Sequence, residues 1–241
     1  FVEHIFPDYL SNLSTCKSPQ QMFGALAKTY YADKINIKPE KMVSVSIMPC
    51  TAKKYECDRS EMRSSGYKDV DYVLTTRELA RMIKQAGIEF NKLEAERYDS
   101  ILGESTGAAV IFGATGGVME AALRTAYELV TGREVPFTNL DIKPVRGMDG
   151  IKEAAIKIKD TVPQWRFLEG VELRVAIAHG LANAKKLVEA IRDGKATYHF
   201  VEIMACPGGC IGGGGQPIPT NMEIRKNRTE AIYNEDANMP L

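Results

Sequence analysis

The sequence predicts an α/β fold of two lobes, each with a small, mostly parallel sheet flanked by helices. Three observations support this prediction. Short apolar stretches at 42–48, 71–74, 175–178 and 199–204 have the length of strands. Segments with helical spacing alternate with them, and strand–helix–strand units of this kind form parallel sheets. The 241 residues are enough for one large domain or for two small lobes with a sizeable core.

In the first half of the chain, caps and glycines set the limits of the expected helices. Residues 18–21, with the sequence S-P-Q-Q, predict a helix start with a serine cap, a proline in the first turn and a capping-box glutamine. The stretch 42–48 is expected to be a buried strand. Residues 75–78 form a second capping box, and the helix that they open is expected to end at Gly87. Residues 88–106 are expected to be an irregular loop with one helical turn.

In the second half, residues 115–130 predict a long helix that ends before Gly132, and residues 154–158 predict a shorter one. The stretch 175–178 is expected to be a strand that leads into a helix over 182–192, and 199–204 the last strand. Proline and glycine make 135–150 the expected hinge. The approximate lobes are therefore 1–135 and 136–241, and their chains can interleave.

Charge and cysteine usage exclude several classes of function. The 31 basic and 31 acidic residues balance, with no long run of one sign, so the sequence lacks the footprint of nucleic-acid or anionic-membrane binding. No apolar run is long enough to span a bilayer, and a basic signal-peptide region is missing. Five unevenly spaced cysteines do not indicate a disulfide framework; they favour a reducing, cytoplasmic compartment. Because the chain starts at Phe1, we expect it to be a fragment.

Residues 205–217 are the most informative segment. Their sequence, A-C-P-G-G-C-I-G-G-G-G-Q-P, places two thiols, Cys206 and Cys210, in a run that contains six glycines. Glycine allows the backbone to approach a bulky ligand and to adopt positive φ. A small dithiol redox pair needs less room, so the segment favours a large thiolate-bound inorganic cluster.

A second thiol motif, M-P-C-T-A-K-K, occupies residues 48–54. It places Cys50 just after the expected strand 42–48, followed by the cations Lys53 and Lys54. Nearby cations stabilise thiolates and offset the negative charge of inorganic clusters. Cys50 and Cys206 both follow strands, and ligands in parallel α/β folds bind at the carboxyl ends of strands.

Other interpretations of these motifs remain open at this level. The C-x-x-x-C spacing is compatible with structural zinc, although the three histidines of the chain show no pairing, and buried structural thiols are the plain alternative. Cys16 and Cys57 have no glycine-rich or cationic setting and are expected to be ordinary thiols. Gly113–Gly117 precedes a helix and could hold a phosphate, but we favour a role in close packing.

Taken together, the motifs resemble those of the FeFe (iron-only) hydrogenases. The second cysteine motif of that family, M-P-C-T-x-K-K, is similar to residues 48–54, and the third, M-A-C-x-G-G-C-x-x-G-G-G-Q-P, is similar to residues 204–217. Further resemblance lies at 13–14, 17–21, 75–80 and 111–122. The segments follow the family order over nearly the whole chain, which is identified as the active-site (H-cluster) domain of a large subunit.

The resemblance implies an H-cluster in the cleft between the two lobes: a 4Fe–4S cluster bridged to a two-iron subsite with carbon monoxide, cyanide and dithiolate ligands. By resemblance, Cys50, Cys206 and Cys210 ligate the 4Fe–4S cluster, and Cys210 also bridges to the two-iron subsite. Lys53 would donate a hydrogen bond to a cyanide, and Ser14 matches a serine on the proton route. Five residues would line the pocket: Gln20, Met48, Pro49, Phe112 and Met204.

The implied activity is the reversible interconversion of hydrogen with protons and electrons by an oxidoreductase. The first cysteine motif of the family, T-S-C-C-P-x-W, is not in this sequence. The missing fourth ligand is therefore expected from a missing N-terminal part of the same protein or from a separate chain. Ferredoxin or a relay domain or subunit is the expected electron partner. The alternative is a non-catalytic iron–sulfur sensor or assembly protein, which would need neither Lys53 nor a methionine-lined pocket.

Overall fold

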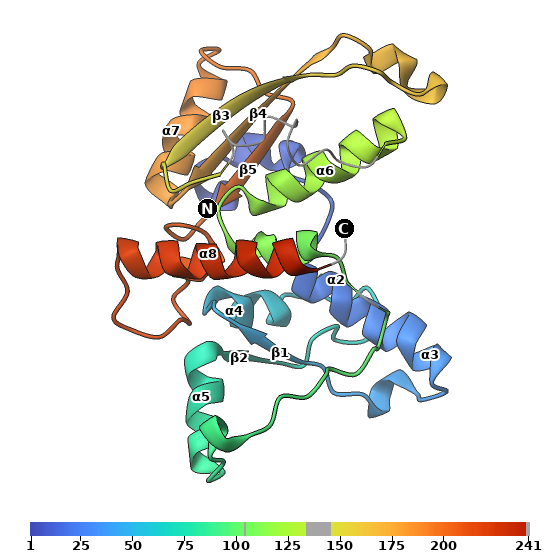
Figure 1. Cartoon of the computed structure of the whole chain (residues 1–241), viewed down its shortest axis with the longest axis vertical. Helices are drawn as coiled ribbons and strands as arrows, with labels where there is room; N and C mark the ends of the chain where they lie inside the picture. The colour runs from blue at the N-terminus through green and yellow to red at the C-terminus, as the bar shows by residue number, and fades with distance from the viewer. Residues whose placement is uncertain (104, 134–145, 240–241) are drawn as a thin grey trace. The chain divides into compact units, whose positions relative to one another are not determined.

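The computed structural model describes residues 1–103, 105–133 and 146–239 (Figure 1). Contacts divide the chain into two compact units. The first comprises Phe1–Glu104 and Gly214–Ile218, and the second comprises Ser105–Gly213 and Pro219–Leu241. This division differs from the expected lobes 1–135 and 136–241. Residue 135 and most of the expected hinge lie outside the described residues.

The first unit holds a parallel pair of strands, β1 (Val45–Met48) and β2 (Tyr72–Thr75), in the register Val45↔Tyr72 to Met48↔Thr75. Helix α4 (Ala52–Asp58) follows β1, and α5 (Thr76–Gln85) follows β2. Helix α2 (Pro19–Leu26) continues through a π-helical turn, η2 (Ala27–Tyr31), into α3 (Ala32–Lys34). Shorter turns complete the unit: α1 (Val2–Ile5), η1 (Pro7–Asn12), η3 (Pro39–Lys41) and η4 (Phe90–Lys92).

Both predicted helix starts of this unit are confirmed. The Ser18 hydroxyl accepts the Gln21 N–H, and Thr75 and Glu78 form a complete capping box at the start of α5. The box at α2 is only half formed, because the Gln21 side chain is fully buried and its amide has no hydrogen-bond partner among the described residues.

The prediction of a buried strand at 42–48 is only partly right. A strand forms there, but Val45 and Ile47 are exposed in the described chain. A strand is buried on both faces only where other elements pack against both faces of its sheet. The core of this unit instead lies under β2 and α4, where Cys57, Val70 and Val73 are buried and Met48 packs against them.

The second unit is built on a mixed sheet in the order β3-β4-β5, formed by β3 (Ile151–Lys157), β4 (Glu172–His179) and β5 (Phe200–Met204). The β3–β4 pair is antiparallel and the β4–β5 pair is parallel. Helices α6 (Gly117–Thr131), α7 (Leu181–Arg192) and α8 (Met222–Asn238) complete the unit. The described part of the unit also contains the 3-10 segments η5 (Gly107–Gly113), η7 (Pro163–Leu168) and η8 (Cys210–Gly212).

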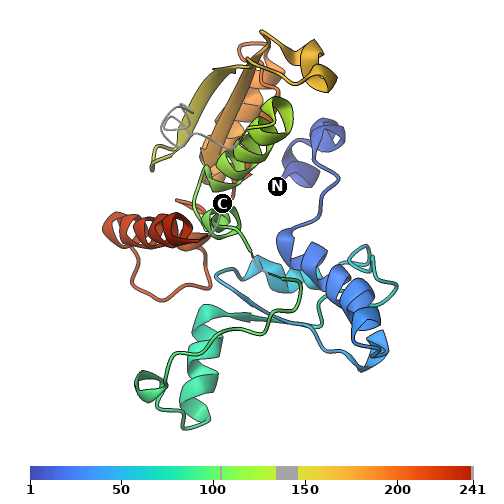
Figure 2. The same cartoon turned by 45° about the vertical axis from the view of Figure 1, so that its right-hand side comes forward.

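Strand β4 is the middle strand of the sheet in the second unit, with α6 on one face and α7 on the other (Figures 1 and 2). Its residues alternate between two cores. Val175 and Ile177 pack with Met119 and Leu123 of α6 on one face. Ala176 and Ala178 pack with Leu187 of α7 on the other face. A central strand that is covered on both faces is expected to be continuously apolar, and all four residues from 175 to 178 are buried. The α/β class, with small sheets flanked by helices, is thus confirmed.

The prediction of a helix at 154–158 is wrong, because these residues belong to β3. Their side chains alternate as a strand requires: Ala154 and Ile156 pack on the core, whereas Ala155 and Lys157 are exposed. Alanine and lysine are common in helices, and this composition concealed the period of two. Pairing from Ile151↔Ala178 to Lys157↔Glu172 fixes the strand.

Helix α8 was not predicted from the sequence. Asn221 caps it by accepting the Ile224 N–H at 2.8 Å. The helix packs against η5, and Gly107 permits the close approach, since a Cβ at this position would lie 2.4 Å from Asp236 Oδ1. No helix among residues 1–103, 105–133 and 146–239 is long and apolar enough to cross a membrane.

Candidate metal centre

Cys50 lies two residues after β1, immediately before α4, and is half-buried. The chain beside it is held by Gly215, whose N–H donates to the Pro49 carbonyl at 3.0 Å. A Cβ at Gly215 would lie 2.8 Å from the Cys50 nitrogen, so only glycine fits this close approach. The strand end that carries Cys50 is therefore packed directly on the glycine segment that follows Cys210 in the sequence.

Arg77 at the start of α5 fixes the same glycine segment. Its guanidinium donates to the carbonyls of Gln216 and Gly214, both at 2.9 Å, and its backbone N–H donates to the Gly215 carbonyl at 3.2 Å. Three hydrogen bonds from one residue leave this stretch little freedom. The T-T-R-E motif of the sequence thus supplies both the cap of α5 and an anchor for the glycine segment.

Lys53 lies in the first turn of α4, and its ammonium pairs with Glu56 of the same helix at 2.9 Å. Polar groups at the start of α2 contact both residues. Gln20 is buried and donates through Nε2 to the Lys53 carbonyl at 3.4 Å and to Glu56 at 3.3 Å, whereas Gln20 Oε1 has no hydrogen-bond partner among the described residues. Ser18 also donates to Glu56, at 2.9 Å. Ser14 is exposed and accepts the Cys16 N–H at 3.1 Å.

Cys206 and Cys210 occupy a tight turn after β5. Between them Gly208 and Gly209 have φ values of 81° and 95°, a region that L side chains rarely adopt. The Gly208 carbonyl accepts the Thr115 N–H at 3.0 Å, and a Cβ at Gly209 would lie 2.7 Å from that same nitrogen. Gly117 at the start of α6 packs equally closely on η5, because a Cβ there would clash with the Ile111 carbonyl. This contact agrees with the close-packing role that the sequence favoured for residues 113–117.

His179, the last residue of β4, holds the same turn. Its Nδ1 accepts the Gly208 N–H at 3.0 Å, so its Nε2 carries the proton and donates to the Met148 carbonyl at 3.0 Å. His179 is buried. Sequence reasoning missed this residue because no second histidine lies near it in the chain. Its position at the end of an expected strand was the signal that could have placed it near the cysteine turn, because the end of β4 lies beside the end of β5.

A buried carboxylate joins the cysteine strand to α6. Glu202 of β5 accepts the N–H groups of Gly116 at 2.6 Å and Met119 at 2.7 Å, which are donors at the first turn of the helix. Burial raises the pKa of Glu202, although these hydrogen bonds oppose the shift. Lys152 of β3, also buried, donates to the carbonyls of Thr115 at 3.1 Å and Gly147 at 3.0 Å.

Burial lowers the pKa of Lys152 to about 8, against an attraction to Glu202 that raises it. Between pH 8 and 10.5 the unfolded chain binds the proton that the folded chain has lost, so this lysine makes the free energy of unfolding rise with pH. In the wild type, Lys152 is expected to raise the free energy of unfolding by about 3 kcal/mol between pH 8 and 10.5. We expect this increase to be absent in Lys152→Met. Urea unfolding followed by the fluorescence of Trp165 at several pH values measures it.

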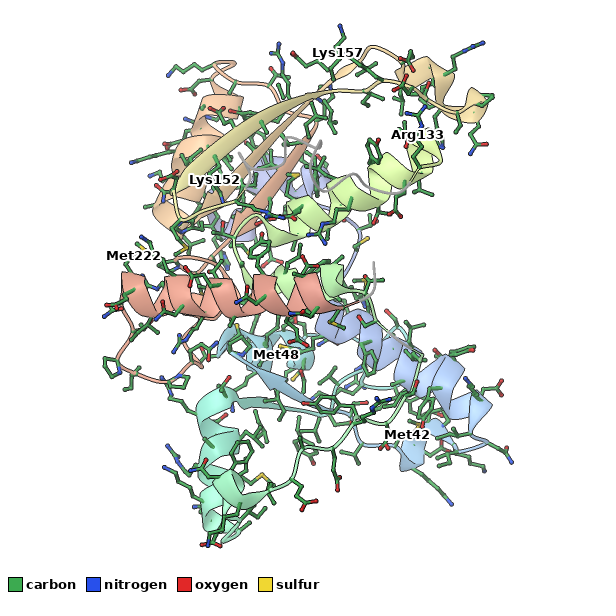
Figure 3. The ribbon with its side chains drawn as sticks, viewed as in Figure 1. Met42, Met48, Arg133, Lys152, Lys157 and Met222 are labelled. Atoms are coloured by element: carbon green, nitrogen blue, oxygen red, sulfur yellow. The ribbon has the colours of Figure 1, made fainter. Side chains whose placement is uncertain are left out.

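Lys157→Met is the matched control, because Lys157 lies on the same strand but is exposed (Figure 3). We expect it to keep the pH dependence of the wild type. Equal slopes in the wild type and Lys152→Met would contradict the assignment of a charged, desolvated Lys152.

The remaining predicted residues lie near the two cysteine segments. Met48 ends β1 and packs on the core of the first unit (Figure 3). Met204 ends β5, and its carbonyl accepts the Gly180 N–H at 2.8 Å. Phe112 lies in η5 and is half-buried. A cavity of about 480 Å³ lies between α6 and β3, and none of the predicted site residues lines it.

The structure places the three predicted ligands in two groups. Cys206 and Cys210 share one turn of the second unit, and Cys50 lies in the first unit. Among the described residues, no group of three or more His, Cys, Asp or Glu side chains gathers closely enough to hold a single metal ion. In a cubane cluster, by contrast, each thiolate binds a different iron atom.

The comparisons with known proteins decide the family. Residues 1–214 match the model of the iron only hydrogenase large subunit, C-terminal domain. The chain belongs to this family. It is 55% identical over 242 residues to the NADP-reducing hydrogenase subunit HndD of Solidesulfovibrio fructosivorans, and 51% identical over 234 residues to the periplasmic [Fe] hydrogenase large subunit of Nitratidesulfovibrio vulgaris.

These alignments cover 100% and 97% of this hydrogenase-family chain but only 39% and 53% of the two relatives, so the chain spans about half or less of their length. A cytosolic Fe-S cluster assembly factor of Xenopus tropicalis is also similar, at 33% identity over 233 residues, 93% of the chain and 46% of that relative. The family therefore includes relatives named as hydrogenases and relatives named as assembly factors.

Solved structures agree with the family assignment. An [FeFe]-hydrogenase structure described as a step of H-cluster assembly aligns with a TM-score of 0.81 at 44% identity, over 99% of this chain and 65% of its own. A variant of [FeFe]-hydrogenase HydA1 from Chlamydomonas reinhardtii aligns with a TM-score of 0.82 at 43% identity, over the same shares.

Proposed function

We propose that this hydrogenase-family domain is the catalytic core of an enzyme that interconverts hydrogen with protons and electrons. In this proposal Cys50, Cys206 and Cys210 bind the 4Fe–4S cluster of an H-cluster, and Cys210 bridges to its two-iron subsite. The hydrogen bond from Gly215 to Pro49 is the observation that carries the proposal. It ties the strand end before Cys50 to a glycine five residues after Cys210.

Chain geometry extends this observation. Gly214 also packs against Thr51, because a Cβ at Gly214 would lie 3.4 Å from the Thr51 hydroxyl. Only three residues separate Cys210 from Gly214. The segment packed beside Cys50 therefore follows Cys210 almost directly along the chain.

The residues present fit such a group. Iron–sulfur clusters are held by cysteine thiolates. At Gly208, Gly209 and Gly215 the neighbouring atoms leave no space for a side chain. The buried Gln20 Oε1, without a hydrogen-bond partner among the described residues, adds an unused polar atom beside Lys53. When bound, the group supplies a one-electron store in the cubane and an open iron where hydrogen is formed or split.

The protein's own residues bind, orient and exclude water in this proposal. Lys53 has three N–H donors; Glu56 uses part of this capacity, and a remaining N–H is proposed to bind a cyanide. Ser14 Oγ accepts a backbone N–H, so its hydroxyl proton is available for transfer along a proton route. Five residues are proposed to line the pocket: Gln20, Met48, Pro49, Phe112 and Met204.

The proposed electron partner is a ferredoxin or a relay domain or subunit, and the fourth cluster ligand is proposed to come from a further part of the protein. The chain aligns with only 39% and 53% of the lengths of the two relatives, which supports a larger whole protein. A cytoplasmic, reducing location is proposed from the odd number of cysteines. Because one relative is named periplasmic, cell fractionation is the test of location.

A second candidate function is a non-catalytic iron–sulfur assembly protein. The relatives named as assembly factors, at 32–34% identity, support it. This reading requires the cluster thiols but not the two-iron subsite. The higher identity of 44–55% to relatives named as hydrogenases favours the catalytic proposal.

Infrared spectroscopy of the whole protein, matured anaerobically, separates the two functions. The catalytic proposal predicts carbonyl and cyanide bands together with hydrogen evolution. Lys53→Met is expected to shift a cyanide band and to lower activity by about 10- to 100-fold, as loss of an outer-shell partner does at metal sites.

Lys54→Met is the matched control. Lys54 is the adjacent cation, but it pairs with Glu78 of α5 at 2.9 Å and is partly exposed. We expect its bands and activity to remain near those of the wild type. Iron and sulfide without carbonyl or cyanide bands would instead identify an assembly protein.

A further inference from the structure

Helix α8 brings a cation against the cysteine turn of the second unit. The helix begins at Met222 (Figure 3) and contacts η8, the 3-10 segment that starts at Cys210. We propose that Arg225 of α8 raises the reduction potential of the iron–sulfur centre held by Cys206 and Cys210. This inference rests on the proposed function, because it requires the turn to hold an iron–sulfur centre. It assigns a role to a residue that the sequence motifs did not mark.

The Arg225 side chain lies along both flanks of Cys210. Gly208 and Gly212 stand two residues before and two residues after Cys210. A Cβ at Gly212 would lie 3.2 Å from Arg225 Nε, and a Cβ at Gly208 would lie 3.4 Å from Arg225 Cδ. The turn therefore has no side chains at the two positions where the arginine passes, so the guanidinium reaches the backbone that carries the thiols.

Arg225 Nε is a buried donor that the described residues leave unused. It is shielded from solvent and has no hydrogen-bond partner among them. Such a donor is costly unless a ligand accepts from it. Arg228, one turn further along α8, behaves differently: its Nη1 donates to the Ile211 carbonyl at 2.8 Å. Arg228 thus holds the turn, whereas Arg225 presents an N–H toward it.

The charge of Arg225 is not neutralised by an ion pair with any carboxylate of the described residues, and its Nε is buried without a hydrogen-bond partner among them. Glu202, the buried carboxylate of β5, instead accepts two backbone N–H groups of α6. An unneutralised cation in partly buried surroundings exerts a stronger field than one in water. One-electron reduction of the centre, by a low-potential donor such as dithionite, makes it more negative by one charge. A nearby cation therefore favours the reduced form.

The test is a redox titration of the whole protein carrying its centre, followed by electron paramagnetic resonance. Arg225→Gln is expected to move the midpoint potential to a more negative value. Arg225→Lys, which keeps the charge, is expected to stay closer to the wild type. Lys226→Gln is the matched control, because Lys226 is the next residue of the same helix but is exposed. Its potential is expected to be unchanged.

The possible outcomes separate this inference from the proposed function. A wild-type protein that takes up no iron would contradict the proposed function itself. A loaded Arg225→Gln protein with the wild-type potential overturns the inference alone. If Arg225→Gln does not load, Arg225→Met replaces it, since its stem still packs on Gly208 and Gly212. Failure of both neutral variants to load, with normal loading of Arg225→Lys, assigns the cation to assembly and overturns the role in tuning.

Discussion

Replacing Cys210 by serine is expected to abolish both parts of the H-cluster in the whole protein, whereas replacing Cys57 by serine leaves the cluster in place. Cys210 lies in a glycine-rich turn, and in our proposal its thiolate serves the cubane and the two-iron subsite together. No other thiol lies between Cys206 and the end of the chain to replace it. Iron content, the infrared bands and hydrogen evolution should all fall to background in Cys210→Ser.

Cys57 is a stringent control because it is a buried thiol in α4, the helix that follows Cys50 in the sequence. It packs with Val70 and Val73, and its Sγ donates to the Lys54 carbonyl at 3.1 Å. Burial raises the pKa of Cys57, which keeps it a neutral thiol and unsuited to bind iron. A serine hydroxyl can keep the hydrogen bond to Lys54. Equal loss of iron in both variants would overturn the ligand assignment.

The elements that the sequence predicted correctly are those with a local signature. Thr75 and Glu78 mark the start of α5, and Gly132 in the left-handed region marks the end of α6. Helix α8 lacks such a signature apart from its Asn221 cap, since polar residues surround the helix and few of its side chains are buried. Its position depends on tertiary contacts with η5, which local periodicity does not show.

The candidate site follows the same division. Both cysteine segments could be located, because glycines and strand ends are visible in the sequence. His179 and Arg225 could not, because each acts on the turn through space from another element. The anchoring of the glycine segment by Arg77 is equally non-local, because the bonded partners are 137 and 139 positions apart in the sequence. Motifs therefore mark the candidate ligands, whereas the groups that contact their segments from other elements appear only in the fold.

The second large effect is expected at Arg124, the centre of a buried ionic network between α6 and α8. Its guanidinium binds Asp236 with both Nη atoms, at 2.8 and 2.7 Å, and Glu120 at 2.6 Å. Glu120 is fully buried and also accepts hydrogen bonds from Arg146 and Tyr233. Burial alone would raise the pKa of Glu120, but its arginine partners hold that pKa below its usual value.

Arg124→Met should therefore lower the free energy of unfolding by about 3–5 kcal/mol, because it leaves buried carboxylates without their partner. Arg146 still pairs with Glu120 at 2.6 Å, so the uncompensated charge falls mainly on Asp236. Urea unfolding followed by the fluorescence of Trp165, the single tryptophan and a residue of the same unit, measures the change.

The surface pair of Arg133 with Asp160, at 3.4 Å and exposed on both sides, provides the control. Because water screens such a pair, Arg133→Met should change stability little. Double replacement Arg124→Met with Asp236→Leu should recover part of the loss, since removing both charges leaves no orphaned carboxylate on α8. If the double variant is no more stable than Arg124→Met, the loss reflects packing of the arginine stem and not the ionic link between α6 and α8.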